Sequence, residues 1–185
     1  GTANGKPYNC TAGGTSAFTD VAPTDSYCKH AHYLAVQNVT LGCSATQFCP
    51  GATVNREAMA AFLARALVAP GGGPAVPIAY TDSGTGLSYD CDAGTPNIHF
   101  TDVPPSDGFC KHVHFLWAKG IVGGCGATTY CPTGDVARDA MAKFLVNAFQ
   151  HILEMNTRQD VLKYDEDGYP HFLVGDKLTS EQHEF

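Results

Sequence analysis

The chain has 185 residues, a formal net charge of −7 and eight cysteines. Nucleic-acid-binding surfaces neutralise phosphates with Lys and Arg, so an acidic chain without a basic stripe argues against that function. No apolar run approaches the roughly 18 residues that a membrane-spanning helix needs. Charged residues make up only 16% of the chain, beside 20 glycines and 11 prolines. This composition is typical of a loop-rich exported module held together by cross-links.

The sequence is internally duplicated. Residues 18–67 align without gaps on residues 100–149 at a constant offset of 82, and 25 of the 50 paired positions are identical. Repeats of this kind decide the architecture before any other signal is considered. We therefore expect a first repeat over 1–70, a Gly/Pro-rich linker over 71–88, a second repeat over 89–156 and a C-terminal tail over 157–185.

Apolar residues at helical spacing predict two helices in each repeat. The four helices are expected over 26–39, 55–67, 108–122 and 137–152. Asp25 and Asp107 stand where N-terminal caps belong, and Asn55 stands before the second helix of the first repeat. The stretch 68–99 is too rich in Gly and Pro to predict a core element. The expected fold is mainly α, with two tandem disulfide-braced helix–loop–helix repeats, long irregular loops and an extended C-terminal tail.

Each repeat carries four cysteines at matching positions: Cys10, Cys28, Cys43, Cys49 and then Cys91, Cys110, Cys125, Cys131. Four cysteines allow three pairings within a repeat. The last two cysteines of each set lie six residues apart across a Gly-rich turn, a spacing that closes a tight loop, and this leaves the first two to pair. An even count in symmetric positions predicts disulfides and an extracytoplasmic location: secreted, cell surface or periplasm.

The paired motifs CKHAH (28–32) and CKHVH (110–114) leave a metal site as the alternative. Its ligands would be Cys28, His30, Cys43 and Cys49, with Cys110, His112, Cys125 and Cys131 as the twin set. However, neither a C-x2-C knuckle nor a CxxCH haem motif is present. On a helix, His30 and His32 would point about 200° apart, as would His112 and His114, so one ion could not bind both. We therefore expect disulfides, with neither metal nor cofactor.

Three motifs carry a resemblance to a known family. FTDVPPSD, LWAKGIVGGCG and YCPTGDVARDAMAKFL, all within 100–149, resemble the S-layer homology repeat in its cysteine-containing form. Residues 18–67 match the same pattern, with NVTLGC at the turn. The resemblance implies helix–loop–helix prongs, usually three in a pseudo-threefold bundle. It also implies non-covalent attachment of an exported protein to cell-wall polysaccharide, often through an acidic ketal-pyruvyl sugar.

The chain departs from that family in two respects. Only two repeats are present, and the Thr-Arg-Ala-Glu signature is replaced by NREA (55–58) and ARDA (137–140). The resemblance makes Arg56 and Arg138 candidate glycan-binding residues, because a guanidinium can hold a sugar carboxylate by two hydrogen bonds. The structural alternative is that each arginine bonds a neighbouring acidic side chain or a loop carbonyl. Trp117 is expected in the core, with sugar stacking as the alternative.

No arrangement in the sequence predicts catalysis, and Asp20 and Asp102 are best explained as turn formers. The tail, 157–185, has no cysteine and mixes charges with hydrophobic clusters, which a solvated tail would lack. We expect it to be an arm that docks on a larger exported protein or on another copy. Its candidate anchors are Tyr164, Tyr169, Phe172 and Leu173.

Two functions follow from these features. The favoured one is a non-catalytic structural or interaction protein of the cell envelope, which joins a larger extracellular or envelope assembly through its repeats and its arm. The alternative is an anchoring module that binds cell-wall polysaccharide. In both cases we expect a chain that neither spans the membrane nor binds nucleic acid.

Overall fold

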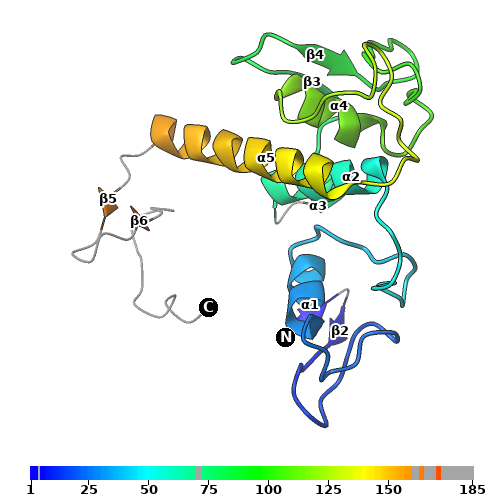
Figure 1. Cartoon of the computed structure of the whole chain (residues 1–185), viewed down its shortest axis with the longest axis vertical. Helices are drawn as coiled ribbons and strands as arrows, with labels where there is room; N and C mark the ends of the chain where they lie inside the picture. The colour runs from blue at the N-terminus through cyan, green and yellow to red at the C-terminus, as the bar shows by residue number, and fades with distance from the viewer. Residues whose placement is uncertain (4, 70–71, 160–162, 165–169, 172–185) are drawn as a thin grey trace.

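The computed structural model describes residues 1–3, 5–69, 72–159, 163–164 and 170–171 (Figure 1). The chain is mainly α-helical with little strand, which confirms the expected class. The helices are α1 (Cys28–Val36), α2 (Arg56–Leu67), α3 (Gly72–Ala75), α4 (Cys110–Ala118) and α5 (Arg138–Gln159). The strands are β1 (Thr2–Ala3), β2 (Lys6–Pro7), β3 (Ala79–Thr81), β4 (Ser88–Asp90), β5 (Lys163–Tyr164) and β6 (Pro170–His171), and they form three antiparallel pairs in chain order.

The first helix of each repeat begins later than its sequence pattern predicts. α1 and α4 both start at the cysteine, and neither has a side-chain cap. Asp25 accepts instead from the N–H of Ala22 at 2.8 Å, and Asp107 accepts from the N–H of Phe109 at 2.7 Å. The predicted caps were therefore wrong, because each carboxylate bonds within the turn before the helix. The prediction for Asn55 is confirmed, since its side chain accepts from the N–H of Ala58 at 2.9 Å.

The Gly/Pro-rich stretch contributes to the core, contrary to expectation. It forms α3 and the β3–β4 hairpin, which contacts α4, and it buries Val76 and Tyr89. The Tyr89 hydroxyl donates to the carbonyl of Pro77 at 2.6 Å. Short strands in a Gly-rich stretch gave no clear alternation of apolar residues, so pattern analysis missed them.

The hydrophobic side chains form two separate buried clusters. The larger cluster joins α2 to α4 and includes the hairpin and one side of α5. The smaller cluster lies around α1 and the N-terminal segment, with Phe18 and Val21 at its centre. Figure 1 shows α1 and β2 apart from α2, α4 and α5, and in the described part of the chain the backbone of α1 does not approach that of α2 or α5. The second helix of the first repeat thus packs on the first helix of the second repeat.

Four disulfides brace the fold, as predicted. They join Cys10–Cys28, Cys43–Cys49, Cys91–Cys110 and Cys125–Cys131, and no described cysteine is free. On the loop-entropy account, a disulfide that closes a short loop adds about 2 kcal/mol, and one that closes a loop of about 19 residues adds about 3 kcal/mol. Small clusters of buried side chains need such support.

Candidate functional site

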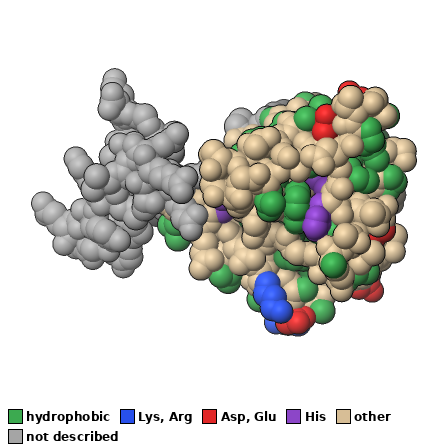
Figure 2. Space-filling model, turned by 90° about the horizontal axis from the view of Figure 1, so that it is seen from above, with side chains coloured by type: hydrophobic (Ala, Val, Ile, Leu, Met, Phe, Trp, Pro, Cys, Tyr) green, Lys and Arg blue, Asp and Glu red, His purple; other side chains and the backbone are tan. Residues whose placement is uncertain are grey.

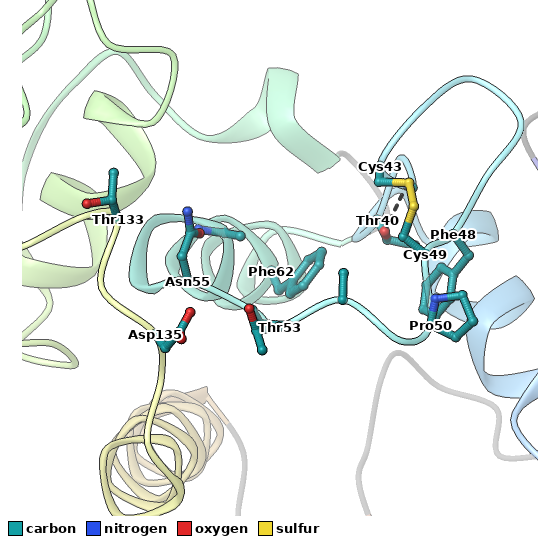
Figure 3. Close-up of a pocket in the computed structure, with 14 residues that line it drawn as sticks. Thr40, Cys43, Phe48, Cys49, Pro50, Thr53, Asn55, Phe62, Thr133 and Asp135 are labelled. Atoms are coloured by element: carbon teal, nitrogen blue, oxygen red, sulfur yellow. Dashed lines mark hydrogen bonds between the residues drawn. A yellow bond between two sulfur atoms is a disulfide. The ribbon is translucent and has the colours of Figure 1, made fainter.

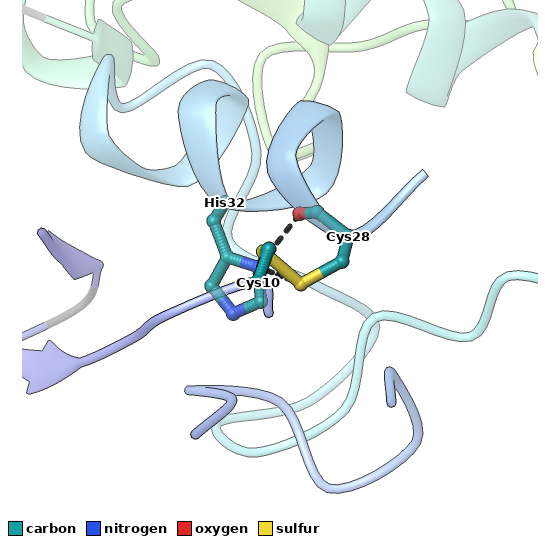
Figure 4. A group of neighbouring side chains, drawn as sticks. All are labelled: Cys10, Cys28 and His32. Atoms are coloured by element: carbon teal, nitrogen blue, oxygen red, sulfur yellow. Dashed lines mark hydrogen bonds between the residues drawn. A yellow bond between two sulfur atoms is a disulfide. The ribbon is translucent and has the colours of Figure 1, made fainter. Parts of the chain in front are cut away.

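The second histidine of each CKHxH motif is buried. Figure 4 shows the first of them, His32, beside the Cys10–Cys28 disulfide. His32 Nδ1 lies 2.7 Å from the carbonyl oxygen of Cys28, and its Nε2 accepts from the N–H of Ala17 at 3.0 Å. His114 repeats this arrangement with the carbonyl of Cys110 at 2.9 Å and the N–H of Phe100 at 3.1 Å. Each ring is therefore neutral, with the proton on Nδ1, and it joins the start of the helix to the preceding loop.

The same histidines lie beside sulfur atoms in a way that suggests a metal site. Cys10, Cys28 and His32 form one such group, and Cys91, Cys110 and His114 form the other. In both groups the two sulfur atoms are joined in a disulfide, so no thiolate is available. Both ring nitrogens already bond backbone groups. The geometry is that of a disulfide packed on an imidazole, and the ligand set considered from sequence, with His30 and His112, is not assembled.

The first histidine of each motif differs between the copies. His30 is exposed, whereas His112 is 3% exposed. Among the described residues, neither ring nitrogen of His112 has a hydrogen-bond partner. Burial, reinforced by the charges of Arg65 and Lys111, lowers the pKa of His112 to about 4. His112 is therefore neutral at physiological pH and lies at the contact between α4 and the α2–α3 segment.

Asp20 and Asp102, which were expected to be turn formers, make matching hydrogen bonds in the two repeats. Asp20 accepts from the N–H groups of Phe48 and Cys49, at 2.8 and 2.7 Å. Asp102 accepts from the N–H groups of Tyr130 and Cys131, both at 2.8 Å. Burial would raise the pKa of Asp20, but these backbone bonds outweigh it and hold that pKa below its usual value. Each aspartate therefore holds the cysteine loop of its own repeat, 28 residues further along the chain, rather than closing a local turn as expected.

Arg56 lies at the junction between the two halves. Its Nε donates to the carbonyl of Tyr130 at 2.8 Å, and one terminal nitrogen donates to the carbonyl of Gly123 at 2.9 Å. The guanidinium also lies over the rings of Tyr130 and Phe144, 4.6 and 5.4 Å from their centroids. The Tyr130 hydroxyl in turn donates to the carbonyl of Arg56 at 3.1 Å. Burial raises the pKa of Tyr130 to about 12.

These contacts bear directly on the two candidate glycan-binding residues. Arg56 bonds loop carbonyls, which is the structural alternative considered from sequence. Arg138 occupies the same motif position at the start of α5, is exposed, and has no hydrogen bond or ion pair within the described part of the chain. Arg56 is therefore engaged within the chain, whereas the exposed Arg138 is free to meet a ligand or partner.

A hollow of about 510 Å³ lies beside the first cysteine loop (Figure 3). Phe48 and the Cys43–Cys49 disulfide line one side, and Phe62 of α2 lines another. Asp135, from the segment before α5, lines the rim opposite the cysteine loop. A smaller hollow of about 240 Å³ lies at the matching place in the second half, where Arg56 forms part of its wall.

Two further polar groups are explained by packing. Lys119 Nζ lies 3.4 Å from Asp82 Oδ2 and donates to the Tyr80 hydroxyl at 3.1 Å. Burial alone would raise the pKa of Asp82, but its hydrogen bonds and the Lys119 charge lower it to about 2. Trp117 is partly buried and stacks on His99 with 4.3 Å between ring centroids, so it packs at the edge of the large cluster.

The predicted docking residues of the tail lie outside what the structure describes. The backbone of Tyr164 belongs to β5, but its side chain and the residues Tyr169, Phe172 and Leu173 are not described. The described part of α5 runs to Gln159, past the residue 156 at which the second repeat was expected to end.

Comparisons with known proteins add no family. A scan against models of protein families finds no match, and a search of curated proteins finds no significant similarity. Among the described helices, none combines the length and the apolar character needed to cross a membrane. On the face drawn in Figure 2, charged side chains are few and hydrophobic side chains are scattered between polar and backbone atoms.

Proposed function

We propose that the chain is an exported, non-catalytic subunit of a cell-envelope protein assembly, built from two S-layer-homology-like repeats. The oxidised cysteine pairs support an oxidising, extracytoplasmic environment. The motifs in 18–67 and 100–149, together with the repeated histidine and aspartate contacts, support the repeat assignment.

A row of exposed apolar side chains on α5 carries this proposal. Leu145, Val146, Phe149 and Leu153 are 39, 53, 63 and 44% exposed. At the offset of 82, Leu145 and Val146 correspond to Leu63 and Ala64 of α2. These two α2 residues are 9 and 0% exposed, because α4 covers them. A contiguous exposed apolar row of this kind marks a surface that another protein covers.

The test is the native mass of the protein purified from its own envelope without denaturant. The proposal expects a mass well above that of one chain, with the excess accounted for by protein. A lone monomer that sediments with isolated cell-wall sacculi would contradict it.

That contradicting result would favour the second candidate, a module that binds wall polysaccharide. The specific observation in its favour is Arg138, an exposed guanidinium at the motif position that grips the sugar in the resembled family. Its test is wall binding by Arg138→Ala, because Arg56 is already occupied by loop carbonyls. Wall binding by this variant that equals that of the unchanged chain would remove Arg138 from any glycan site.

A further inference from the structure

The junction between α2 and α4 shows how a second helix of one repeat joins the first helix of the next. Ala60, Leu63 and Ala64 of α2 share one buried cluster with Val113 and Leu116 of α4. Beside this apolar contact, the arginine at the start of α2 reaches the loop after α4 and donates to two of its carbonyls. The junction thus combines an apolar helix face with an inserted arginine.

The face that α2 contributes to this junction has a counterpart on α5, and that counterpart is exposed. At the offset of 82, Leu145, Val146 and Phe149 of α5 correspond to Leu63, Ala64 and Leu67 of α2. All three α5 residues are exposed, and α5 uses a different side, with Phe144 and Ala148, to pack against the body of the protein. The inserted arginine has its counterpart in Arg138, which is exposed as well.

The face that α4 contributes to the junction has a counterpart on α1. Leu34 of α1 is 37% exposed, whereas its counterpart Leu116 is 0% exposed. His30 of α1 is exposed, whereas its counterpart His112 is buried. Two positions of the face that α2 covers on α4 are therefore exposed on α1, whereas Ala31, the counterpart of Val113, is buried.

The two hollows complete this comparison. The small hollow is lined by Gly124, Ala140 and Phe144 together with Arg56. The large hollow is lined by the residues at the matching positions: Gly42, Ala58 and Phe62. Among the described residues that line the large hollow there is no arginine, and the carboxylate of Asp135 lies on its rim. An acidic rim attracts a guanidinium and repels an acidic sugar.

We propose that copies of this chain associate head to tail, with α5 of one copy covering α1 of the next. Arg138 then enters the large hollow of the next copy and donates to the carbonyls of Leu41 and Phe48, the counterparts of Gly123 and Tyr130. Among the described residues the backbones of α1 and α5 do not approach each other, so we assign the covering of α1 to a second copy. The hollow itself is already lined by Asp135, three residues before Arg138 in the same chain. Such a heterologous contact builds a ring or a filament. This inference rests on the proposed function and names a second copy as the partner.

The test uses sedimentation velocity on the purified full chain over a wide concentration range. The unchanged chain is expected to form larger species as its concentration rises. Val146→Asp, which breaks the α5 face, and Leu34→Asp, which breaks the α1 face, should each abolish growth beyond the monomer. Ile78→Asp is the matched control, because Ile78 is 55% exposed and belongs to neither face.

Mixing the two variants gives the decisive result. Each variant keeps one intact face, so the α5 face of the Leu34→Asp chain should bind the α1 face of the Val146→Asp chain. The mixture is then expected to form a dimer of one copy of each that does not grow further. Arg138→Ala should weaken the association of the unchanged chain at least tenfold.

Four results would overturn the inference. The first is a chain that stays monomeric at hundreds of micromolar, and the second is a mixture that stays monomeric. The third is association that Val146→Asp abolishes and Leu34→Asp leaves intact, which indicates α5 against α5. The fourth is a fall in the melting temperature of the dilute Val146→Asp chain, which indicates that the face is covered within one chain. The proposed function survives all four if native envelope material still contains another protein.

Discussion

Arg56 and Arg138 begin equivalent helices in two copies of one motif, yet their surroundings differ completely. Arg56 has a cysteine loop within reach because the second repeat follows it in the chain. Arg138 has no hydrogen bond or ion pair with the described part of the chain, and it is exposed. The role of each arginine depends on what the rest of the chain places beside it, so the motif alone left both a ligand role and a structural role open.

Replacing the two arginines by alanine should therefore have unequal effects. Arg56→Ala removes two charge-assisted hydrogen bonds and the contact with two rings, so it should lower the free energy of unfolding by about 3 kcal/mol. Arg138→Ala should leave it unchanged in a dilute, monomeric sample. Chemical denaturation followed by circular dichroism measures both. Equal losses would show that Arg138 has a partner within the chain.

The buried neutral His112 predicts a specific loss of stability in mild acid. Its folded pKa is lowered to about 4 from an unfolded value of about 6.5. The unfolded chain therefore binds the proton more readily, and the stability is fully present above about pH 6.5 and is lost as the pH falls toward 4. The expected loss is on the order of 2 kcal/mol, after allowance for partial solvent screening.

Two leucine variants isolate this effect. His112→Leu should weaken, without abolishing, the dependence of the melting temperature on pH between 6.5 and 4, because burial also lowers the pKa of His114. His30→Leu changes the exposed counterpart and should leave that dependence as it is. The lowered pKa of Asp82 and Asp20 acts only at lower pH, where stability is lost as the pH falls through their folded values. A slope that His112→Leu does not alter would contradict the assignment.

At the scale of elements, the sequence predicted those features that depend on residues close together in the chain. The spacing of the cysteines and the cap at Asn55 were read correctly because each depends on residues close in sequence. The packing of α2 on α4 could not be read, because apolar spacing shows which face is buried but not which helix covers it. The large hollow was missed for the same reason, since Phe48, Phe62 and Asp135 meet only in the folded chain.

The two disulfides of the second repeat should differ in their contribution to stability. The Cys91–Cys110 bridge closes a separation of 19 residues, and the Cys125–Cys131 bridge closes one of 6. Replacing the first pair by alanine should cost about 3 kcal/mol, and replacing the second about 2 kcal/mol, because longer loops gain more entropy on unfolding. Denaturant unfolding of both double variants checks the order. The opposite order would show that native packing, rather than loop closure, dominates.

At the scale of the whole molecule, the chain contains one closed helix–helix junction and two exposed helix faces that resemble its two sides. α2 on α4 is the closed instance, whereas the α5 face and the α1 face remain exposed. A bundle of three repeats could bury such faces within one chain. Within the described part of the chain no helix covers the exposed residues of these two faces, and the head-to-tail association proposed above would bury them.

The last prediction concerns the tail, for which the anchors Tyr164, Tyr169, Phe172 and Leu173 were inferred from sequence. A segment this short, without a cysteine, buries too little surface to order itself, and aromatic anchors contribute most at protein contacts. Deleting 160–185 leaves α5 intact to Gln159. The shortened chain should keep its melting temperature and its head-to-tail association, while it loses proteins that co-purify from the envelope. A markedly lower melting temperature, with co-purifying proteins retained, would show that the tail instead packs on its own chain.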